Sequence, residues 1–438
     1  MAKKKTETTE EMSFVGDFPS LNSLLQKNDK RGLFKHSAFS VGFPTGFYQL
    51  DYRNGYVTNI YDNDDNVIGK YNNVGLFGGT FNTIIGKTGT AKTTLAAQMA
   101  TNISNYCLNK YKIPAEIYHI DAEQASNYTR IKNITGLSIN HLKSIYHITR
   151  ETTYIEDIYE GIENLVTLKE KYRDTFVVDS GLLDEFGEPI KMFIPTIIII
   201  DSLPSIATKE GKSDDGIEGG LKTGTYANRL AKAISRFYKQ CMPLINKYNL
   251  IVIVINHINA KIEIGGMPTS PQTMYLKMNE SVPGGAAPLY YAHNLFKIVM
   301  DKKLLLEKND VVDGFVARIE LLKSRSNKAG KSCKLIYDQD TGFDPYLSLY
   351  DYINEQGGIG GRNPSRYIIG FTDTKFDDRC LKEYIKNNDE FKKLLVNIGT
   401  SYLEKILSSS KFNDTTPSAD DIQNLYDNLN ESYSDESE

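Results

Sequence analysis

A glycine-rich loop between an apolar run and a helical pattern constrains this chain more than any other feature of its sequence. The loop occupies residues 86–94 and reads GKTGTAKTT. The run FNTII at residues 81–85 precedes it, and the pattern LAAQMA at residues 95–100 follows it. Backbone N–H groups of such a loop turn toward phosphate oxygens, and the helix presents the positive end of its dipole to the same anion. The order predicts a strand, a phosphate-binding loop and a helix.

The loop carries a cation and a hydroxyl at the spacing that ATP with Mg²⁺ requires. Gly86 opens the turn and Gly89 relaxes it. Lys92 is expected to reach the outer phosphates, and Thr93 to offer its hydroxyl to Mg²⁺. The expected cofactors are therefore ATP and Mg²⁺, and the loop residues around them are Gly86, Lys87, Thr88, Gly89, Thr90, Ala91, Lys92, Thr93 and Thr94. Ala91 stands where the motif usually has glycine, and the alternative is a Gly/Thr-rich turn of an ordinary α/β protein.

Length and composition favour a globular cytoplasmic protein. The chain has 438 residues, of which 40% are hydrophobic, which is enough for one large domain and a smaller one. No apolar run approaches the length of a membrane span, and residues 1–7 lack the apolar segment of a secretory signal. The four cysteines are scattered without CxxC spacing, which fits a reducing compartment and argues against a zinc site. We expect no membrane partner.

The pattern along the chain indicates four segments. Residues 1–45 are polar and flexible at first, and residues 46–341 alternate apolar strands with amphipathic helices, which implies a mostly parallel, helix-covered sheet. A smaller domain is expected at residues 342–410, and an acidic tail at residues 411–438. Within these segments, residues 20–25 are expected to form a short helix and residues 59–73 a hairpin. A calcium loop at the hairpin tip is the alternative, but the spacing to a terminal glutamate is missing.

Charge is distributed unevenly along the chain. Residues 414–438 hold eight acidic side chains and no lysine or arginine, so the formal net charge of −4 becomes +4 when they are removed. A mildly basic body with an acidic tail suggests a surface that binds a polyanion and a tail that competes for it. The alternative is a solvated terminus that aids solubility.

Two further strands are predicted to end in carboxylates. The run IPTIIII at residues 194–200 ends at Asp201, which is expected to hold the Mg²⁺ shell opposite Thr93. The run AEIYHI at residues 115–120 leads to Glu123, which is expected to polarise the attacking water beside the phosphate loop. A carboxylate at a strand end is often only a helix cap. The glycine-rich loop and these two carboxylates are three features at one edge of a sheet, and together they favour a nucleotide site.

Six sequence blocks follow one another in an order typical of one family. They are residues 86–94, IDAE at 120–123, IIDS at 199–202, VINH at 254–257, PGGAAPLYYA at 283–292 and LKSR at 322–325. On these blocks, over roughly residues 40–355, the chain resembles the RecA-type recombinases, and within them the UvsX branch of T-even-like bacteriophages.

The resemblance implies a RecA-like P-loop NTPase core with a mostly parallel sheet, followed by a small C-terminal α+β domain. It implies a DNA-dependent ATPase that forms helical filaments on single-stranded DNA and exchanges strands with homologous double-stranded DNA in recombination, repair and recombination-dependent replication. Residues 1–45 would then serve polymerisation, and mediator and single-strand-binding proteins would be partners, in the host bacterial cytoplasm if the source is viral. By the same resemblance, Glu123 is the catalytic carboxylate and His257 belongs to a switch between nucleotide and DNA. The other interpretation of His257 is a satisfied histidine at a strand end.

Several residues are expected to contact DNA on the strength of this resemblance. Two loops, about residues 208–225 and 259–285, correspond to the family's DNA-binding loops, and a basic helix follows the first. The expected DNA-binding residues are Arg229, Arg236, Lys232, Lys261, Tyr275, Lys277, Gly284 and Gly285. The alternative for the arginines is a solvated basic helix face.

The resemblance also concerns contacts at the nucleotide. Lys323 and Arg325 resemble a pair that reaches the γ-phosphate of a neighbouring protomer, which makes hydrolysis depend on assembly. The alternative is that both are solvated at a strand end. Where the family usually stacks a tyrosine on adenine, this chain has Arg130, with Tyr128 two residues earlier, so either side chain is a candidate.

The sequence is also compatible with two other functions. One is a RecA-fold hexameric DNA helicase or motor, which is disfavoured by residues 121–123 and by the loop that ends at Gly284 and Gly285. The other is a nucleotide-binding scaffold that assembles without exchanging strands.

Overall fold

The structure is a computed structural model that describes residues 14–15, 18–19, 40–62, 64, 66–151, 154–209, 225–260, 273–305 and 312–408. Contacts divide the chain into two units, Met1–Phe39 and Ser40–Glu438. In the first unit, β1 (Phe14–Val15) pairs antiparallel with β2 (Phe18–Pro19). The helix expected at residues 20–25 and the acidic tail at 411–438 lie outside the described residues.

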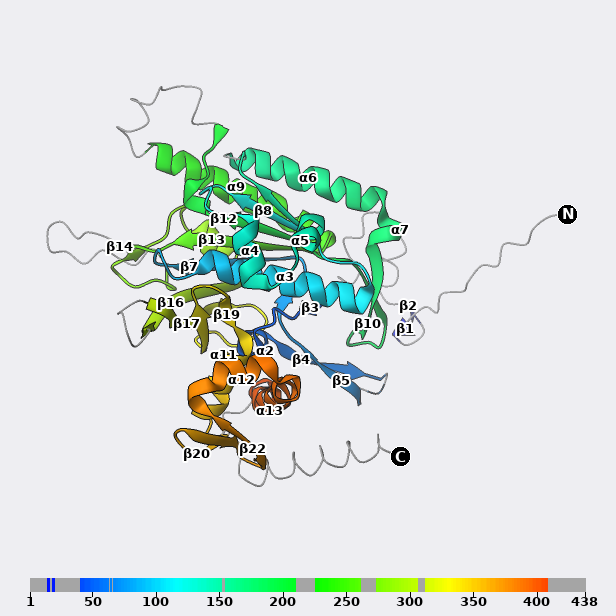
Figure 1. Cartoon of the computed structure of the whole chain (residues 1–438). Helices are drawn as coiled ribbons and strands as arrows, with labels where there is room; N and C mark the ends of the chain where they lie inside the picture. Colours follow the sequence, from blue (N-terminus) through cyan, green and yellow to red (C-terminus); the bar gives the residue numbers. More distant parts are fainter. Residues whose placement is uncertain are drawn as a thin grey trace. The chain divides into compact units, whose positions relative to one another are not determined.

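Among the described residues, nine strands of the second unit form one sheet in the order β19-β18-β17-β16-β7-β13-β12-β8-β9 (Figure 1). Neighbouring strands from β16 to β9 are parallel, and those from β16 to β19 are antiparallel. The strands are β7 (Thr80–Gly86), β8 (Ile117–Asp121), β9 (Tyr146–Thr149), β12 (Thr196–Asp201), β13 (Leu250–His257), β16 (Asn294–Leu305), β17 (Val312–Ser324), β18 (Ser332–Asp338) and β19 (Gly342–Asp344). The predicted α/β class with a mostly parallel sheet is confirmed.

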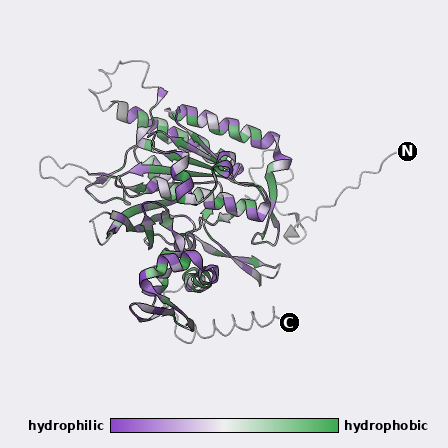
Figure 2. Cartoon of the chain, viewed as in Figure 1, coloured by the Kyte–Doolittle hydropathy of each residue, from purple (hydrophilic) through white to green (hydrophobic). Residues whose placement is uncertain are grey.

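The central strands are buried because their sequences are continuously apolar. β12 reads TIIIID and is buried throughout, and β13 reads LIVIVINH and is buried up to its last residue. β-Branched side chains pack well on a pleated surface, and such runs occur where helices cover both faces of a parallel sheet. The hydropathy colouring shows these strands as hydrophobic, whereas hydrophilic and hydrophobic residues alternate along α6 (Figure 2).

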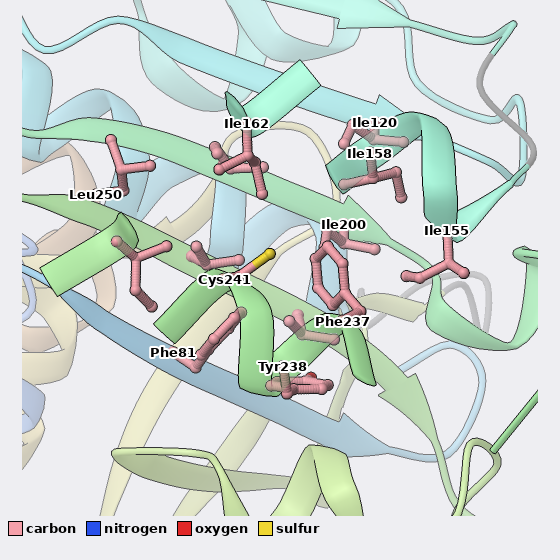
Figure 3. Packing of buried hydrophobic residues seen from close by; sticks show 14 of the residues in the cluster. Phe81, Ile120, Ile155, Ile158, Ile162, Ile200, Phe237, Tyr238, Cys241 and Leu250 are labelled. Atoms are coloured by element: carbon pink, nitrogen blue, oxygen red, sulfur yellow. The ribbon is translucent and has the colours of Figure 1, made fainter. Parts of the chain in front are cut away.

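Helices cover both faces of the sheet. α6 and α9 pack on one face, and α3 lies across the other (Figure 1). On the first face, Phe237 and Cys241 of α9 pack with Phe81 of β7 and Ile200 of β12 in one apolar cluster (Figure 3). The helices connected with this sheet are α3 (Lys92–Tyr111), α4 (Tyr128–Thr135), α5 (Ile139–Ile145), α6 (Ile155–Lys171), α7 (Arg173–Phe176), α9 (Thr225–Lys247) and α10 (Ala287–Tyr290), with the short turn η1 (Leu203–Ser205).

Two antiparallel hairpins contact each other beside the sheet. β4 (Tyr56–Tyr61) pairs with β5 (Val67–Asn73), which confirms the hairpin predicted at residues 59–73. β10 (Val177–Leu183) pairs with β11 (Pro189–Phe193). The backbone N–H of Tyr61 donates to Glu185 O over 3.0 Å, which joins the tips. Two smaller pairs are β3 (Gly42–Phe43) with β6 (Leu76–Phe77), and β14 (Asn259–Ala260) with β15 (Glu280–Ser281).

The C-terminal region of the second unit packs around a separate apolar cluster that also takes in Tyr52 of α2 (Tyr48–Asn54). Its elements are α11 (Pro345–Glu355), β20 (Ile359–Arg362), β21 (Ser365–Ile368), β22 (Phe371–Asp377), η3 (Asp378–Cys380), α12 (Leu381–Asn387) and α13 (Asp389–Ser408). β19, at residues 342–344, belongs to the central sheet rather than to this cluster. None of the helices in the described ranges is long and apolar enough to cross a membrane.

Candidate active site

Four parallel strands end at the same edge of the sheet, and three of them end in a polar residue. β7 ends at Gly86, β8 at Asp121, β12 at Asp201 and β13 at His257. The register pairs Asp201 with Asp121, and His257 with Gly86. Because Ile200 pairs with Val254, the second pair lies two residues further along the strands than the first. Ligands of open parallel sheets bind at this carboxyl edge.

The glycine-rich loop connects β7 to α3 in the predicted order of strand, loop and helix. A Cβ at Gly86 would lie 2.9 Å from Ile298 O and 2.9 Å from Thr90 Oγ1, so only glycine fits this close approach. Gly89 has φ +81°, a left-handed conformation that glycine adopts without strain. Ala91 is also left-handed, with φ 60° and ψ 32°, at the position where the motif usually has glycine.

Lys92 is the first residue of α3, and its side chain folds back over the loop. Its Nζ donates to Gly86 O over 3.2 Å and to Lys87 O over 2.8 Å, and the residue is only 5% exposed. Burial lowers the pKa of Lys92, and the negative charges of Asp201 and Glu123 oppose that shift. A buried ammonium held by two carbonyls at a loop of N–H groups is suited to an incoming anion.

Thr93 and Asp201 supply adjoining oxygens. Thr93 Oγ1 donates to Asp201 Oδ2 over 2.6 Å. Among the described residues, no group of three or more His, Cys, Asp or Glu side chains gathers as a metal site. A hydroxyl and one carboxylate, without further protein ligands, fit Mg²⁺ that is held mainly by substrate phosphates and water.

Asp121 is the last residue of β8 and Glu123 lies two residues later, but the two carboxylates have different surroundings. Glu123 Oε1 accepts a hydrogen bond from Ser202 Oγ and lies 3.0 Å from His257 Nε2, and its side chain is 36% exposed. Asp121 is fully buried and accepts from the backbone N–H groups of residues 125 and 126, as a helix cap does. Glu123 is therefore the carboxylate that solvent and a substrate can reach.

The end of β13 is fixed to the glycine-rich loop. The backbone N–H of Ile258 donates to Gly86 O over 3.2 Å. Asn256 Nδ2 donates to Pro283 O over 3.0 Å, and its Oδ1 accepts from the N–H of His257 over 2.8 Å. The segment that leaves β13 and returns at Pro283 is thus tied at both ends to this edge of the sheet.

Arg130 and Tyr128, the two candidates for stacking on adenine, both already have partners. Arg130 donates to Gln339 O over 2.6 Å and to Tyr337 OH over 3.0 Å, which joins α4 to the end of β18. Tyr128 OH donates to Tyr146 O over 2.9 Å. Which of them stacks on a base stays an open prediction.

Lys323 and Arg325 lie at the end of β17. Lys323 Nζ donates to Leu289 O over 3.2 Å, and Arg325 Nη2 donates to Tyr290 O over 3.3 Å. Burial, and then the charge of Arg325, lower the pKa of Lys323 to about 8. In the described part of the chain, no hydrogen bond or ion pair joins either cation to the Lys92 and Glu123 side chains.

The strand register explains this separation. β17 runs antiparallel to β16, so Lys323 pairs with Leu295 of β16. Leu295 in turn pairs with Thr83 of β7, three residues before Gly86. The two cations therefore lie on the amino-terminal side of the glycine-rich loop of their own chain. The site that they were expected to serve is that of a neighbouring chain.

The basic residues of α9 lie on its outer side. Arg229 is half-buried, and Lys232 and Arg236 are exposed. Gly284 and Gly285 have φ +86° and +75° and pack closely against this helix: a Cβ at Gly284 would lie 3.1 Å from Ile234, and one at Gly285 3.3 Å from Ala231. The structure thus brings the predicted glycines next to the predicted basic helix.

The two loops that were expected to bind DNA are described only in part. Residues 210–224 of the first loop and 261–272 of the second, including Lys261, lie outside the described residues. Tyr275 is half-buried, with its ring centroid 5.9 Å from Lys323 Nζ. Lys277 is exposed, and its backbone N–H donates to Glu280 Oε2 over 3.2 Å.

Sequence reasoning missed several residues around the site. Ser202 bonds Glu123, Arg150 Nε lies 3.8 Å from Asp121, and His119 contacts Asp201 and Tyr146. Ser202 and His119 fall inside the segments used for the prediction. The available signal for His119 was a polar residue within an apolar strand, and for Ser202 its position directly after Asp201. Tyr146 is the first residue of β9, and Arg150 follows that strand. No local sequence pattern indicated either residue.

Searches with protein-family models and among curated proteins both found no match to this chain.

Proposed function

We propose that this protein is an ATPase of the RecA-like P-loop type that is activated by DNA and acts as a strand-exchange recombinase. The observation that carries the proposal is the Thr93–Asp201 hydrogen bond of 2.6 Å beside the glycine-rich loop, with Glu123 bonded to Ser202, the residue that follows Asp201. A hydroxyl and carboxylate pair next to a buried loop lysine is what binding of a nucleoside triphosphate with Mg²⁺ requires.

The proposed roles follow from the chemistry of each group. Residues 86–94 bind the phosphates through their N–H groups, and Lys92 leaves its two carbonyl partners for the outer phosphates. Thr93 and Asp201 would hold Mg²⁺, which neutralises phosphate charge when bound. Glu123, exposed and oriented by Ser202 and His257, accepts the proton of the attacking water.

The DNA-binding part of the proposal rests on α9 and the adjacent loop ends. Arg229, Lys232 and Arg236 provide cations for phosphates, and Gly284 and Gly285 allow a backbone to approach closely. Because the segment between β13 and Pro283 is tied to Gly86 and Glu123, occupancy of the nucleotide site is coupled to this surface. Single-stranded DNA is the proposed first partner and double-stranded DNA the second, with mediator and single-strand-binding proteins as further partners.

Lys323 and Arg325 favour an assembly over a monomer. Both are two strands away from β7 and toward its amino-terminal side, so they are proposed to serve the site of the next chain in a helical filament. The pKa of Lys323 is lowered, so an anion such as a γ-phosphate that comes close would stabilise its charged form. In this proposal the protein works in the cytoplasm.

Electron microscopy with single-stranded DNA and a non-hydrolysable ATP analogue tests the proposal, together with ATP hydrolysis measured with and without DNA. We expect helical filaments, DNA-stimulated hydrolysis, and neither in the Lys92→Ala variant. Closed rings would favour a helicase or motor. Assemblies that bind nucleotide without pairing homologous strands would favour a scaffold.

A further inference from the structure

A buried histidine stands directly behind Asp201. His119 lies in β8 and is 0% exposed. Its Nδ1 is 2.9 Å from Tyr146 OH, and its Nε2 is 3.6 Å from Asp201 Oδ2. Within the described residues, His119 Nε2 has no hydrogen-bond partner. A buried, unpartnered polar atom next to a carboxylate at a candidate metal site requires an explanation.

The fold directs His119 toward the beginning of α3. Ile120, the next residue of β8, packs in the cluster of α6 and α9 (Figure 3). Successive side chains of a strand point to opposite faces, so His119 points to the face that α3 covers. Thr93, in the first turn of α3, bonds the same Oδ2 atom of Asp201.

The neighbours of His119 select its tautomer. An Nε2 lone pair facing a carboxylate oxygen would be repelled, so Nε2 carries a hydrogen. Nδ1 is then an acceptor and takes the hydrogen of Tyr146 OH. Burial raises the pKa of Tyr146, as do the charges of Asp201 and Asp121, so this hydroxyl keeps its proton.

We propose that His119, oriented by Tyr146, is a positioning residue for Asp201. The Thr93 hydroxyl donates to Oδ2 from one side, and the imidazole N–H faces the same atom from the sheet at 3.6 Å, a distance that allows electrostatic attraction without a hydrogen bond. This inference rests on the proposed nucleotide site and deepens it, because it explains how a carboxylate only 3% exposed keeps a fixed orientation toward a cation. Groups behind a metal-binding side chain commonly fix its orientation in this way.

Calorimetric binding of ADP, with and without Mg²⁺, tests the role of His119 without measuring turnover. The variants are His119→Phe, which removes both ring nitrogens, His119→Gln, which keeps a donor, and Tyr146→Phe, which removes only the hydroxyl. His147→Phe is the matched control, because His147 is the next residue of β9 and its ring lies beside Tyr118 at 5.1 Å. Unfolding midpoints without any ligand are measured for all of them.

The expected result is a selective loss. In His119→Phe, the gain in ADP affinity that Mg²⁺ provides falls about tenfold, whereas ADP affinity without Mg²⁺ is unchanged. Tyr146→Phe shows a smaller loss of the same kind, His119→Gln is partly rescued, and His147→Phe behaves as the wild type.

Two outcomes overturn the inference. One is a wild-type Mg²⁺ gain in His119→Phe, or in Tyr146→Phe and His119→Gln if the first variant does not fold. The other is an equal loss of ADP affinity with and without Mg²⁺ together with a lower unfolding midpoint, which is the signature of a purely structural residue. If the wild type itself binds no ADP, the proposed function fails, and this result is distinct from both.

Discussion

The backbone N–H of Ile258 donates to the carbonyl of Gly86, so the segment that leaves β13 is attached to the first residue of the glycine-rich loop. His257, one residue earlier, contacts Glu123 over 3.0 Å. A displacement of the loop or of Glu123 therefore moves the start of the segment that returns at Pro283. In the proposed function, this attachment would couple occupancy of the nucleotide site to the proposed DNA surface.

The Glu123→Gln variant separates nucleotide binding from hydrolysis. Glutamine keeps the size of the side chain and can still accept from Ser202, but it is not a base. We expect ATP binding close to that of the wild type and a fall in turnover of at least about a hundredfold. Steady-state hydrolysis and nucleotide titration measure the two properties, and unchanged turnover would remove Glu123 from the mechanism.

Arg229 and Arg236 are expected to contact DNA phosphates rather than base edges. Replacing either one by alanine should weaken binding about equally for every sequence. The slope of log affinity against log salt on single strands should fall by roughly 0.7 for each lost contact. Titrations of two unrelated oligonucleotides at several salt concentrations provide the check. A changed sequence preference with an unchanged slope would contradict this assignment.

Mixing two inactive variants tests whether Lys323 and Arg325 act on a neighbour. One parent is Glu123→Gln, and the other carries Lys323→Ala and Arg325→Ala together. In a random head-to-tail row of equal parts, about a quarter of the interfaces join an intact glutamate to an intact cation pair. We expect ATP hydrolysis to recover by about that fraction, whereas mixtures that show only the summed activities of their parents would contradict action in trans.

Ala91→Gly should stabilise the protein. A left-handed conformation costs a residue with a Cβ roughly 1–2 kcal/mol, and glycine avoids that cost but loses about 0.5–1 kcal/mol in chain entropy. The expected net gain is therefore about 0.5–1 kcal/mol in the free energy of unfolding, measured with denaturant. Ala97→Gly, within the same helix, is the matched control and should destabilise the protein by at least about 1 kcal/mol. Equal effects of the two changes would exclude strain at Ala91.

The buried Lys169 is expected to make the free energy of unfolding depend on pH. Its Nζ donates to Ile194 O over 2.7 Å and to Tyr248 O over 3.1 Å, and burial lowers its pKa to about 7. The unfolded chain keeps this lysine protonated up to about pH 10.5, so it binds more protons than the folded state between about pH 7 and 10.5. Lys169 therefore makes the free energy of unfolding rise with pH in that window.

The comparison is made between Lys169→Met and Lys171→Met, whose lysine is exposed two residues later on α6. The Lys169→Met protein should show a smaller rise of the free energy of unfolding from pH 7 to 10 than the wild type. It should also lose about 1–3 kcal/mol at pH 7, because two buried carbonyls lose their donor. Identical pH slopes in all three proteins would show that Lys169 does not titrate there.

The sequence predicted those parts of the site that depend on local patterns. The apolar runs before Asp201 and Glu123 indicated buried strands of a parallel sheet, and parallel strands bring their ends to one edge of the sheet. The glycine spacing likewise indicated the loop before Lys92.

Other parts depend on pairings between distant segments, which no local pattern encodes. Tyr146 reaches His119 only because β9 pairs with β8, and Tyr52 joins the C-terminal cluster only through the packing of α2. The position of Lys323 relative to Gly86 follows from an antiparallel register, and no spacing in the sequence reveals it.

That register has a consequence for how activity scales with the amount of protein. If each site takes its cations from the next chain, an open row always ends in one subunit without a donor. A single chain would then hydrolyse no ATP, and two chains would share one active site. The rate of hydrolysis per chain would approach a plateau as the rows lengthen. Specific activity would therefore rise with protein concentration and with the length of the DNA template. Blocking one end of a row would remove a smaller fraction of the activity in a longer row.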